Sequence, residues 1–221
     1  MINKNELTLR ENVMLSQKKR SEQIYLSLLL EDYNVTDTLV NAVYNKEVIN
    51  TADINEINAI LNYKEAYREI IQALRTDIDL DLLLKLNKVI ARDDGFDWGV
   101  LRSSRMPIAN SSYIADIPNK EEIVIYLKDI LSIENSTEKA LNLFSYLVKE
   151  NMFWSVNISL ALIVANKIMI ENGCGIILIQ EKLIYEFKGL YLAYLNSNIT
   201  KDDFIQFIYE KCIDGEKVIH I

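Results

Sequence analysis

The residues whose types and spacing best suit chemistry lie in one segment, from Asn151 to Ser159, directly before a strongly hydrophobic stretch. Its polar side chains are two amides and two hydroxyls: Asn151, Ser155, Asn157 and Ser159. Such neutral groups can hydrogen-bond a ligand that is neutral or carries a sugar. An amide, however, takes up no proton at a useful pH, and a hydroxyl offers no charge to a metal ion. The segment therefore indicates binding more than proton-transfer catalysis.

Elsewhere the sequence offers little catalytic chemistry. The only histidine is His220, beside the C-terminus, so no histidine can serve a site in the body of the chain. The acidic cluster Asp77, Asp79 and Asp81 superficially matches a calcium loop but lacks its glycine and its terminal glutamate. Helix capping near Asp81 is the better interpretation, and we expect no metal site. Glycine-rich phosphate-binding motifs are also absent from the sequence.

Long helices must position these residues, because 221 residues contain only six glycines and two prolines. Apolar residues recur at spacings of three and four and predict the helices listed next. They cover residues 15–30, 36–44, 53–75, 79–90, 121–131, 137–149, 157–172, 178–195 and 201–212. Thr36 and Ser136 are the predicted N-caps, and Gly173 suits a C-terminal cap. The helix over 157–172 is apolar on nearly all sides, so it should be central and buried.

Both prolines fall between residues 100 and 118, where the helical pattern stops. Short β-capable pieces flank a turn at 110–112, which predicts one small β-hairpin over 101–113. The expected fold class is therefore mainly α with one small hairpin.

Composition and charge exclude several classes of function. Half of the residues are hydrophobic, and the net charge of −8 disfavours broad binding to nucleic acid. We interpret the run Lys18-Lys19-Arg20 as a solvated helix face. Cys174 and Cys212 are expected to be buried apolar residues, with neither disulfide nor metal-ligand spacing.

The chain also lacks the patterns of membrane and secreted proteins. Residues 1–10 are polar and contain no signal-peptide core. The longest apolar run, 159–170, includes Asn166 and Lys167 and is too short to cross a bilayer. We expect a cytoplasmic protein without membrane contact.

The segment 151–159, followed by the hydrophobic helix, resembles the signature of Fic-domain proteins, H-x-F-x-(D/E)-G-N-(G/K)-R. Phe153 and Asn157 match at the right spacing. Three other pieces agree in order: 98–102 resembles the G-x-x-R start of the family's substrate-docking hairpin, 110–123 the hairpin and the next helix, and 62–66 an upstream helix. The resemblance spans residues 21–195. It implies a Fic-fold helical domain whose hairpin forms a flap beside an active-site groove.

The same resemblance implies N-terminal helices over residues 1–50 and a Fic-like domain over residues 51–221, which together form one structural unit. The piece Ser27 to Asp32 resembles the family's inhibitory helix, (S/T)-x-x-x-E-(G/N). Ser27 and Glu31 share a helix face. In the family this glutamate pairs with the motif arginine and obstructs the nucleotide phosphates. A surface helix ending in an acidic pair remains the alternative.

The departures from the signature affect the chemistry that the family performs, transfer of AMP or a related group to a protein hydroxyl. Asn151 replaces the histidine that acts as general base, and Ser155 replaces the acid that binds Mg²⁺. Val156 replaces the glycine whose backbone binds phosphate. Ser159 replaces the arginine that neutralises phosphate, and Leu162 replaces a second arginine. A β-branched residue disfavours positive φ. We therefore expect Val156 to disfavour the phosphate-binding turn that the glycine forms in the family. Glu31 is left without a charged partner. No catalytic residue of the signature is intact.

Three hypotheses follow. The first is a pseudoenzyme that binds a protein partner through the hairpin and groove, with Arg102, Arg105 and Tyr113 as docking candidates and no cofactor. The alternative is a transferase with altered chemistry that uses a nucleotide or nucleotide-sugar donor. Only this alternative requires ATP and Mg²⁺, with Arg102 and Arg105 supplying the lost positive charge. The third is a structural member of an oligomer.

Overall fold

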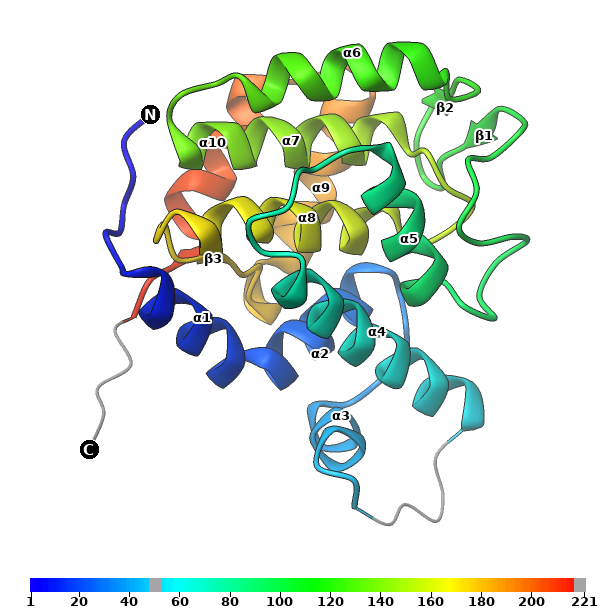
Figure 1. Ribbon diagram of the computed structural model, residues 1–221. Coiled ribbons are helices and arrows are strands. Elements are labelled where there is room, and N and C mark those ends of the chain that lie inside the picture. The colour runs from blue at the N-terminus through cyan, green and yellow to red at the C-terminus, as the bar shows by residue number, and fades with distance from the viewer. Residues whose placement is uncertain (48–52, 217–221) are drawn as a thin grey trace.

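The computed structural model describes residues 1–47 and 53–216, and His220 lies outside this part of the chain. Ten helices and four short strands lie in the described ranges (Figure 1). The helices are α1 (Leu9–Lys18), α2 (Arg20–Leu30), α3 (Asp37–Tyr44), α4 (Ile54–Gln72), α5 (Leu80–Ile90), α6 (Lys120–Leu131), α7 (Ser136–Glu150), α8 (Asn157–Glu171), α9 (Glu181–Leu195) and α10 (Lys201–Lys211). The strands are β1 (Met106–Pro107), β2 (Ile114–Ala115), β3 (Ile176–Ile177) and β4 (Ile213–Asp214). The mainly α prediction is confirmed.

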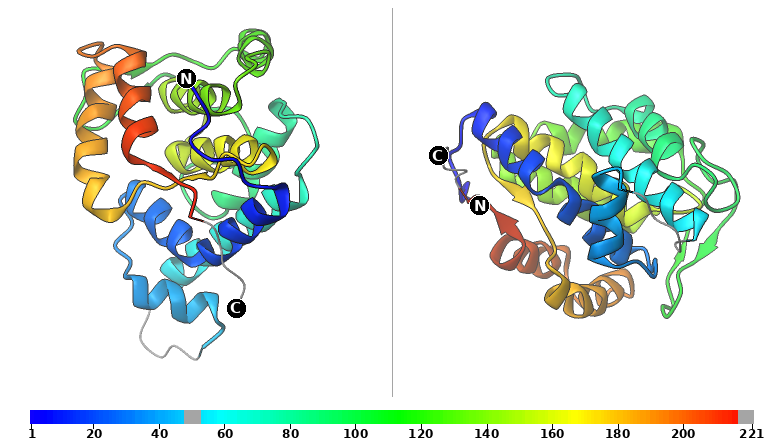
Figure 2. Two further views of the ribbon diagram at one scale, coloured as in Figure 1. Left: turned by 90° about the vertical axis from the view of Figure 1, so that its left-hand side faces the viewer. Right: turned by 90° about the horizontal axis from the view of Figure 1, so that it is seen from below.

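Helix α8 is the centre of the fold, as its all-round hydrophobicity predicts. Every residue from 157 to 170 is buried. Helix α7 is its most extensively packed neighbour, and α1, α2, α4 and α5 also contact it. Helices α9 and α10 lie side by side and cover another flank of the bundle (Figure 2). The N-terminal end of α8 carries the polar segment singled out above, so the whole core fixes its position.

Aromatic side chains lock α9 against this core. The rings of Phe187 on α9 and Phe204 on α10 are 5.8 Å apart, and Phe144 on α7 stacks on Phe204 at 6.2 Å. Such ring pairs add about 0.5–1.5 kcal/mol beyond their buried area. These ring contacts hold the part of α9 after Phe187 beside the N-terminus of α8.

A hairpin forms as predicted from β1 and β2, which pair antiparallel with Met106 opposite Ala115, but β2 lies just beyond the expected range of 101–113. The expectation of a single small β-structure needs correction, because β3 and β4 form a second antiparallel pair with Ile176 opposite Asp214. This pairing also delays the start of α9, which was expected at residue 178 and begins at Glu181. Two-residue strands so distant in sequence leave no local pattern that predicts them.

The helix predicted over 15–30 is two helices that meet at Lys19. Leu15 of α1 packs into a small cluster with Ile170 and Ile176, whereas Ile24 and Leu28 of α2 pack into the main core. Lys19, with φ of −89° and ψ of 9°, interrupts the helix, and Leu26 of α2 also packs into the small cluster. Helix α2 then runs toward the N-terminal end of α8.

Helix caps follow the sequence with one exception. Thr36 caps α3 by accepting the Leu39 N–H at 3.2 Å, as predicted. Asp79 caps α5 by accepting the Leu82 N–H at 2.9 Å, which explains the acidic cluster. Asn135, rather than the predicted Ser136, caps α7 through the Glu138 N–H. The side-chain carbonyl of Asn135, one position earlier, can accept from the same backbone N–H groups at the start of α7, which have no partner within the helix.

Gly173 follows α8 with φ of +68°, and a side chain there would collide with the carbonyl oxygen of Leu7. This explains its place after the helix. Cys174 and Cys212 are buried free thiols, as expected. In the described ranges, we find no helix with the combined length and hydrophobicity of a membrane span.

Candidate functional site

The segment from residue 151 to 156 joins α7 to α8 and contains two left-handed residues. Asn151 ends α7 with φ of 49°, and Val156 precedes α8 with φ of 55° and ψ of 32°. The expectation that a β-branched residue would avoid positive φ at 156 is therefore wrong. A left-handed valine costs about 1–2 kcal/mol, and the surrounding core supplies this because Val156 is itself buried. The chain thus keeps the sharp turn that leads into α8.

The N-terminus of α8 carries an anion from another helix. The Glu31 carboxylate, at the end of α2, accepts the Ser159 backbone N–H at 2.7 Å. The first N–H groups of a helix have no partner within the helix and carry partial positive charge, so a carboxylate there is stabilised. Glu31 was expected to lack a charged partner, and the contact found here is to a backbone N–H at the positive end of a helix.

Two opposed effects act on this carboxylate. Burial raises the pKa of Glu31 to about 7, while the hydrogen bonds from Ser159 oppose the rise and the nearby Asp94 adds to it. The side chain is therefore partly protonated near neutral pH. A second anion brought to the same helix end would meet an occupied position and a repelling charge.

Ser159, which stands where the Fic signature has arginine, is fully buried in a hydrogen-bond network between three helices. Its hydroxyl donates to the Ser27 carbonyl of α2 at 3.1 Å and accepts from the Tyr63 hydroxyl of α4 at 3.1 Å. The Ser27 hydroxyl in turn pairs with Tyr67 at 3.0 Å. The predicted pair Ser27 and Glu31 thus both contact residue 159, one through its hydroxyl and one through its amide.

Asn151, which stands where the signature has histidine, is also buried and engaged. Its amide nitrogen donates to the Tyr191 hydroxyl of α9 at 3.2 Å, and that hydroxyl donates to the Val148 carbonyl at 3.3 Å. Sequence reasoning missed Tyr191. The signal that could have found it is weak: Lys188, Tyr191 and Leu192 share one face of α9 by their spacing.

Phe153 and Asn157, the two positions that match the signature, stabilise the loop. The Asn157 side chain accepts the Phe153 N–H at 2.9 Å and donates to the Phe153 carbonyl at 2.8 Å. The Phe153 ring is buried in the core. Both matches are therefore explained by the shape of the loop and the packing of the core.

A cavity of about 260 Å³ opens at this end of α8. Its walls come from the α2 end, the loop, β1 with its turn, and α9, and include Glu31, Asn151, Ser155, Met106 and Lys188. Lys188 was also missed, and it is the only cation among the described lining residues. It donates to the Leu29 carbonyl at 3.1 Å and pairs with Asp32, so its charge is largely balanced.

The hairpin is fastened at its base by Arg102, which is only 1% exposed. Its guanidinium donates to the carbonyls of Asn151 at 2.6 Å, Ser104, Asp116 and Glu150. The expectation that Arg102 presents charge to a partner or a phosphate is thereby corrected, because its donors are already used. Five donors in a rigid fork suit an arginine to this task.

The other two docking candidates lie nearer the surface. Arg105 is exposed and pairs with Asp116 at 2.9 Å across the hairpin. Tyr113 is half-buried and donates its hydroxyl to the Lys149 carbonyl of α7 at 3.2 Å. The turn is held as well, since the Asn196 side-chain oxygen accepts the Ser112 N–H at 3.0 Å and both serine hydroxyls of the turn. The hairpin is therefore braced against α7 and α9.

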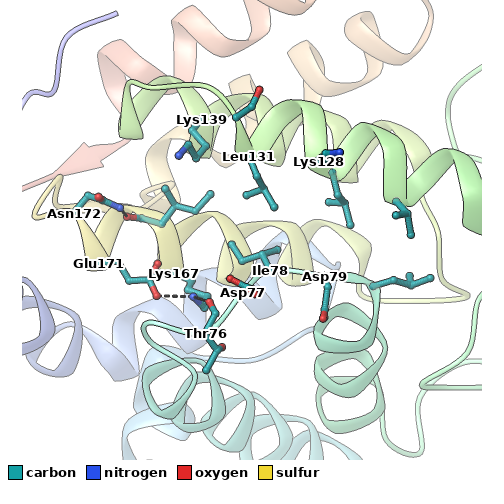
Figure 3. Close-up of a pocket in the computed structure, with 15 residues that line it drawn as sticks. Thr76, Asp77, Ile78, Asp79, Lys128, Leu131, Lys139, Lys167, Glu171 and Asn172 are labelled. Atoms are coloured by element: carbon teal, nitrogen blue, oxygen red, sulfur yellow. Dashed lines mark hydrogen bonds and ion pairs between the residues drawn. The ribbon is translucent and has the colours of Figure 1, made fainter.

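A larger cavity, about 590 Å³, lies toward the other end of α8, between α5, α6 and α7 (Figure 3). Lys167 is buried in its floor, pairs with Glu171 and donates to the Thr76 carbonyl at 2.6 Å. The buried charge of Lys167 is thus paired within the protein. In residues 1–47 and 53–216, we find no group of three or more metal-ligating side chains.

Comparison with known proteins gives a structural answer only. No family model and no curated protein sequence matches the chain. Among solved structures, a Fic domain-containing signaling protein from Bacteroides thetaiotaomicron aligns with a TM-score of 0.72 and 16% identity, over 92% of this chain and 85% of that one.

Two further structures agree. A Fic family protein from Desulfovibrio desulfuricans aligns with a TM-score of 0.69 and 16% identity, over 92% of this chain and 66% of that one. Fic-1 of C. elegans (residues 134–508) aligns with a TM-score of 0.64 and 17% identity, over 91% of this chain and 71% of that one. Each alignment covers more than nine-tenths of this chain.

Proposed function

Starting from the Fic fold, which the chain shares with these proteins, we propose that it acts in the cytoplasm by binding a protein partner and transfers no AMP. The contact that carries the proposal joins the Glu31 carboxylate to the Ser159 N–H at 2.7 Å. A helix N-terminus is where a phosphate would bind, and here it already holds a carboxylate. The chain keeps the shape of the site while filling its anion position.

The neighbouring positions support the same proposal. Asn151 offers an amide where proton transfer needs a group that titrates near neutral pH. The Ser159 hydroxyl is used by Ser27 and Tyr63 and has no charge for a phosphate. The cavity, at about 260 Å³, is smaller than the roughly 300–1,000 Å³ typical of ligand pockets. These features favour a protein that retains a binding surface but not the catalytic groups of the Fic signature.

The hairpin supplies a surface suited to an extended peptide. The Ile108 N–H donates to the Tyr113 carbonyl at 3.2 Å, and the register is fixed by the β1–β2 pair. The hydrogen bonds of antiparallel strands alternate, so the backbone groups of Pro107 and Ile114 face away from the hairpin. Proline has no N–H, whereas Ile114 presents both a donor and an acceptor. The β2 edge is therefore the better place for strand addition.

The side chains at this edge also suit a partner. Ile114 and Ile117 are each 55% exposed, at and just after this edge. Strand addition obtains affinity from backbone hydrogen bonds and specificity from alternate side chains. We therefore commit to one occupant, an extended segment of a partner protein with apolar residues at alternate positions.

The test places a photo-crosslinking amino acid at position 114 and, as a control, at position 185, where Tyr185 of α9 is 92% exposed. Crosslinking in the native host should give one dominant adduct from position 114 and none from 185. Mass spectrometry of the adduct should identify the same unmodified peptide segment each time. Equal adduct patterns from both positions would rule out the hairpin edge as the binding surface.

The alternative, a transferase with altered chemistry, rests on Lys188 in the cavity wall. It predicts that a nucleotide or nucleotide-sugar raises the melting temperature, since a ligand that binds only the folded state stabilises it. The probes are ATP, ADP, UTP and CDP-choline at millimolar concentration, with and without Mg²⁺. A rise that disappears in Lys188→Met would favour the transferase, and no rise with any probe would reject it.

A further inference from the structure

A third cavity has no part in the site above, and its lining carries an unusual excess of positive charge. It measures about 600 Å³ and lies where the start of α2, the end of α3, α4 and the loop after α5 meet. Its lining includes five basic residues: Arg20, Lys46, Lys64, Arg68 and Arg92. Glu65 is the only carboxylate among the described residues that line it, and Arg68 is already paired with it. This concentration of positive charge occurs in a chain whose net charge is −8.

Arg20 is the decisive residue of this cavity. The sequence predicted it on a solvated face, but it is 7% exposed. Its Nε and Nη2 are buried without a hydrogen-bond partner, counting only partners in the described ranges. The guanidinium lies 5.6 Å from the centre of the Tyr67 ring, which offsets only part of its lost hydration. A buried, unpaired charge is costly, so a retained one points to a partner that the protein itself does not supply.

The neighbouring cations would repel one another without such a partner. Lys64 donates to the Tyr44 carbonyl at 2.7 Å and lies over the Tyr44 ring at 4.5 Å, so it is held in place in the cavity wall. Burial and the nearby charge of Lys46 lower the pKa of Lys64. Burial likewise lowers the pKa of Arg20. Both effects have the sign expected for cations gathered without a counter-anion.

We propose that this cavity binds a small phosphorylated molecule, with Arg20 and Lys64 as its principal contacts. Guanidinium groups match phosphate oxygens in charge and fork geometry, and the volume lies within the range of ligand pockets. The concave shape suits a compact polyanion better than a nucleic-acid backbone, which the acidic surface repels. The proposal is independent of the function assigned to the hairpin and the groove.

The experiment measures melting temperature and calorimetric binding at constant ionic strength, with inorganic pyrophosphate and AMP as separate probes and sodium sulfate as the reference. The intact chain should show a saturable rise with at least one phosphate probe beyond that of sulfate. Binding by pyrophosphate alone identifies an inorganic ligand, and tighter binding of AMP identifies a phosphate ester. Arg20→Met should weaken binding at least tenfold, whereas Arg10→Met, at an exposed arginine of α1, should leave it unchanged.

Other variants keep the test decisive. If Arg20→Met does not fold, the double variant Lys64→Met with Arg92→Met should give the same loss. The proposal is overturned if neither probe exceeds sulfate, or if the rise survives both sets of variants. It is also overturned if binding is lost in the groove variant Lys188→Met and kept in Arg20→Met. A response to single-stranded DNA alone would replace it with nucleic-acid binding.

Discussion

The Glu31 carboxylate accepts the backbone N–H of Ser159 at 2.7 Å, so the end of α2 supplies the anion at the start of α8. Residues separated by more than half of the chain thereby share one hydrogen bond. The position has the partial positive charge that a phosphate would otherwise use. Four predictions follow from this contact and from the way the loop and hairpin are held.

Glu31→Gln should change how stability depends on pH. Burial raises the pKa of Glu31 to about 7 from an ordinary value near 4.5. Between these values the folded chain binds a proton that the unfolded chain releases, so stability falls as pH rises from about 4.5 to 7 and then levels off. The carboxylate should cost of order 3 kcal/mol above pH 7.

Urea unfolding at pH 5 and pH 8 checks this. The intact chain should lose stability between the two pH values relative to Glu31→Gln, because glutamine keeps an acceptor oxygen and has no charge. Glu22→Gln, at a partly buried ion pair on the same helix, is the control and should follow the intact chain. A difference that grows in the opposite direction would mean that the α8 N-terminus lowers the pKa more than burial raises it.

Asn151→His should not give AMP transfer. The variant restores a titratable base, but Ser155 still offers no charge to Mg²⁺ and Ser159 none to phosphate. The double variant with Glu31→Gly should also be inactive, although its anion position is open. Mass spectrometry for an added AMP group, on the chain and on any partner, is the measurement. Transfer by Asn151→His alone would show that Ser155 and Ser159 suffice for the chemistry.

Arg102→Met should destabilise the chain by about 2–4 kcal/mol, because it removes a buried cation from four carbonyls and leaves them unpaired. Arg105→Met is the matched control, since its ion pair with Asp116 is solvent-exposed. Such pairs contribute less than about 1 kcal/mol. Denaturant unfolding of both variants compares them, and equal losses would contradict the fastening role of Arg102.

Asn196→Ala should loosen the turn of the hairpin. The Asn196 side chain accepts the Ser112 N–H and the hydroxyls of Ser111 and Ser112. Loss of about 1 kcal/mol per hydrogen bond should speed amide exchange at Ser112 about tenfold or more. Asn198→Ala, two residues along in the same loop, is the control. Unchanged exchange at Ser112 would show that Tyr113 and Arg102 alone hold the hairpin.

The sequence by itself determined most of the helices, the Thr36 cap of α3 and the central place of α8. These features depend on neighbours within a few residues, through hydrophobic periodicity and orphan N–H groups, so local patterns report them. The resemblance to Fic proteins extended this to the fold as a whole.

Only the tertiary structure decided which residues that lie far apart in the sequence contact one another. It brought Glu31 to α8, buried Arg20 and Arg102, paired β3 with β4 and held Val156 in a left-handed conformation. In each case the energy comes from groups distant in sequence: a packed core can impose a strained backbone, and burial decides whether a charge meets water or a carbonyl. A basic run therefore looks solvated in sequence, although its Arg20 lines a cavity.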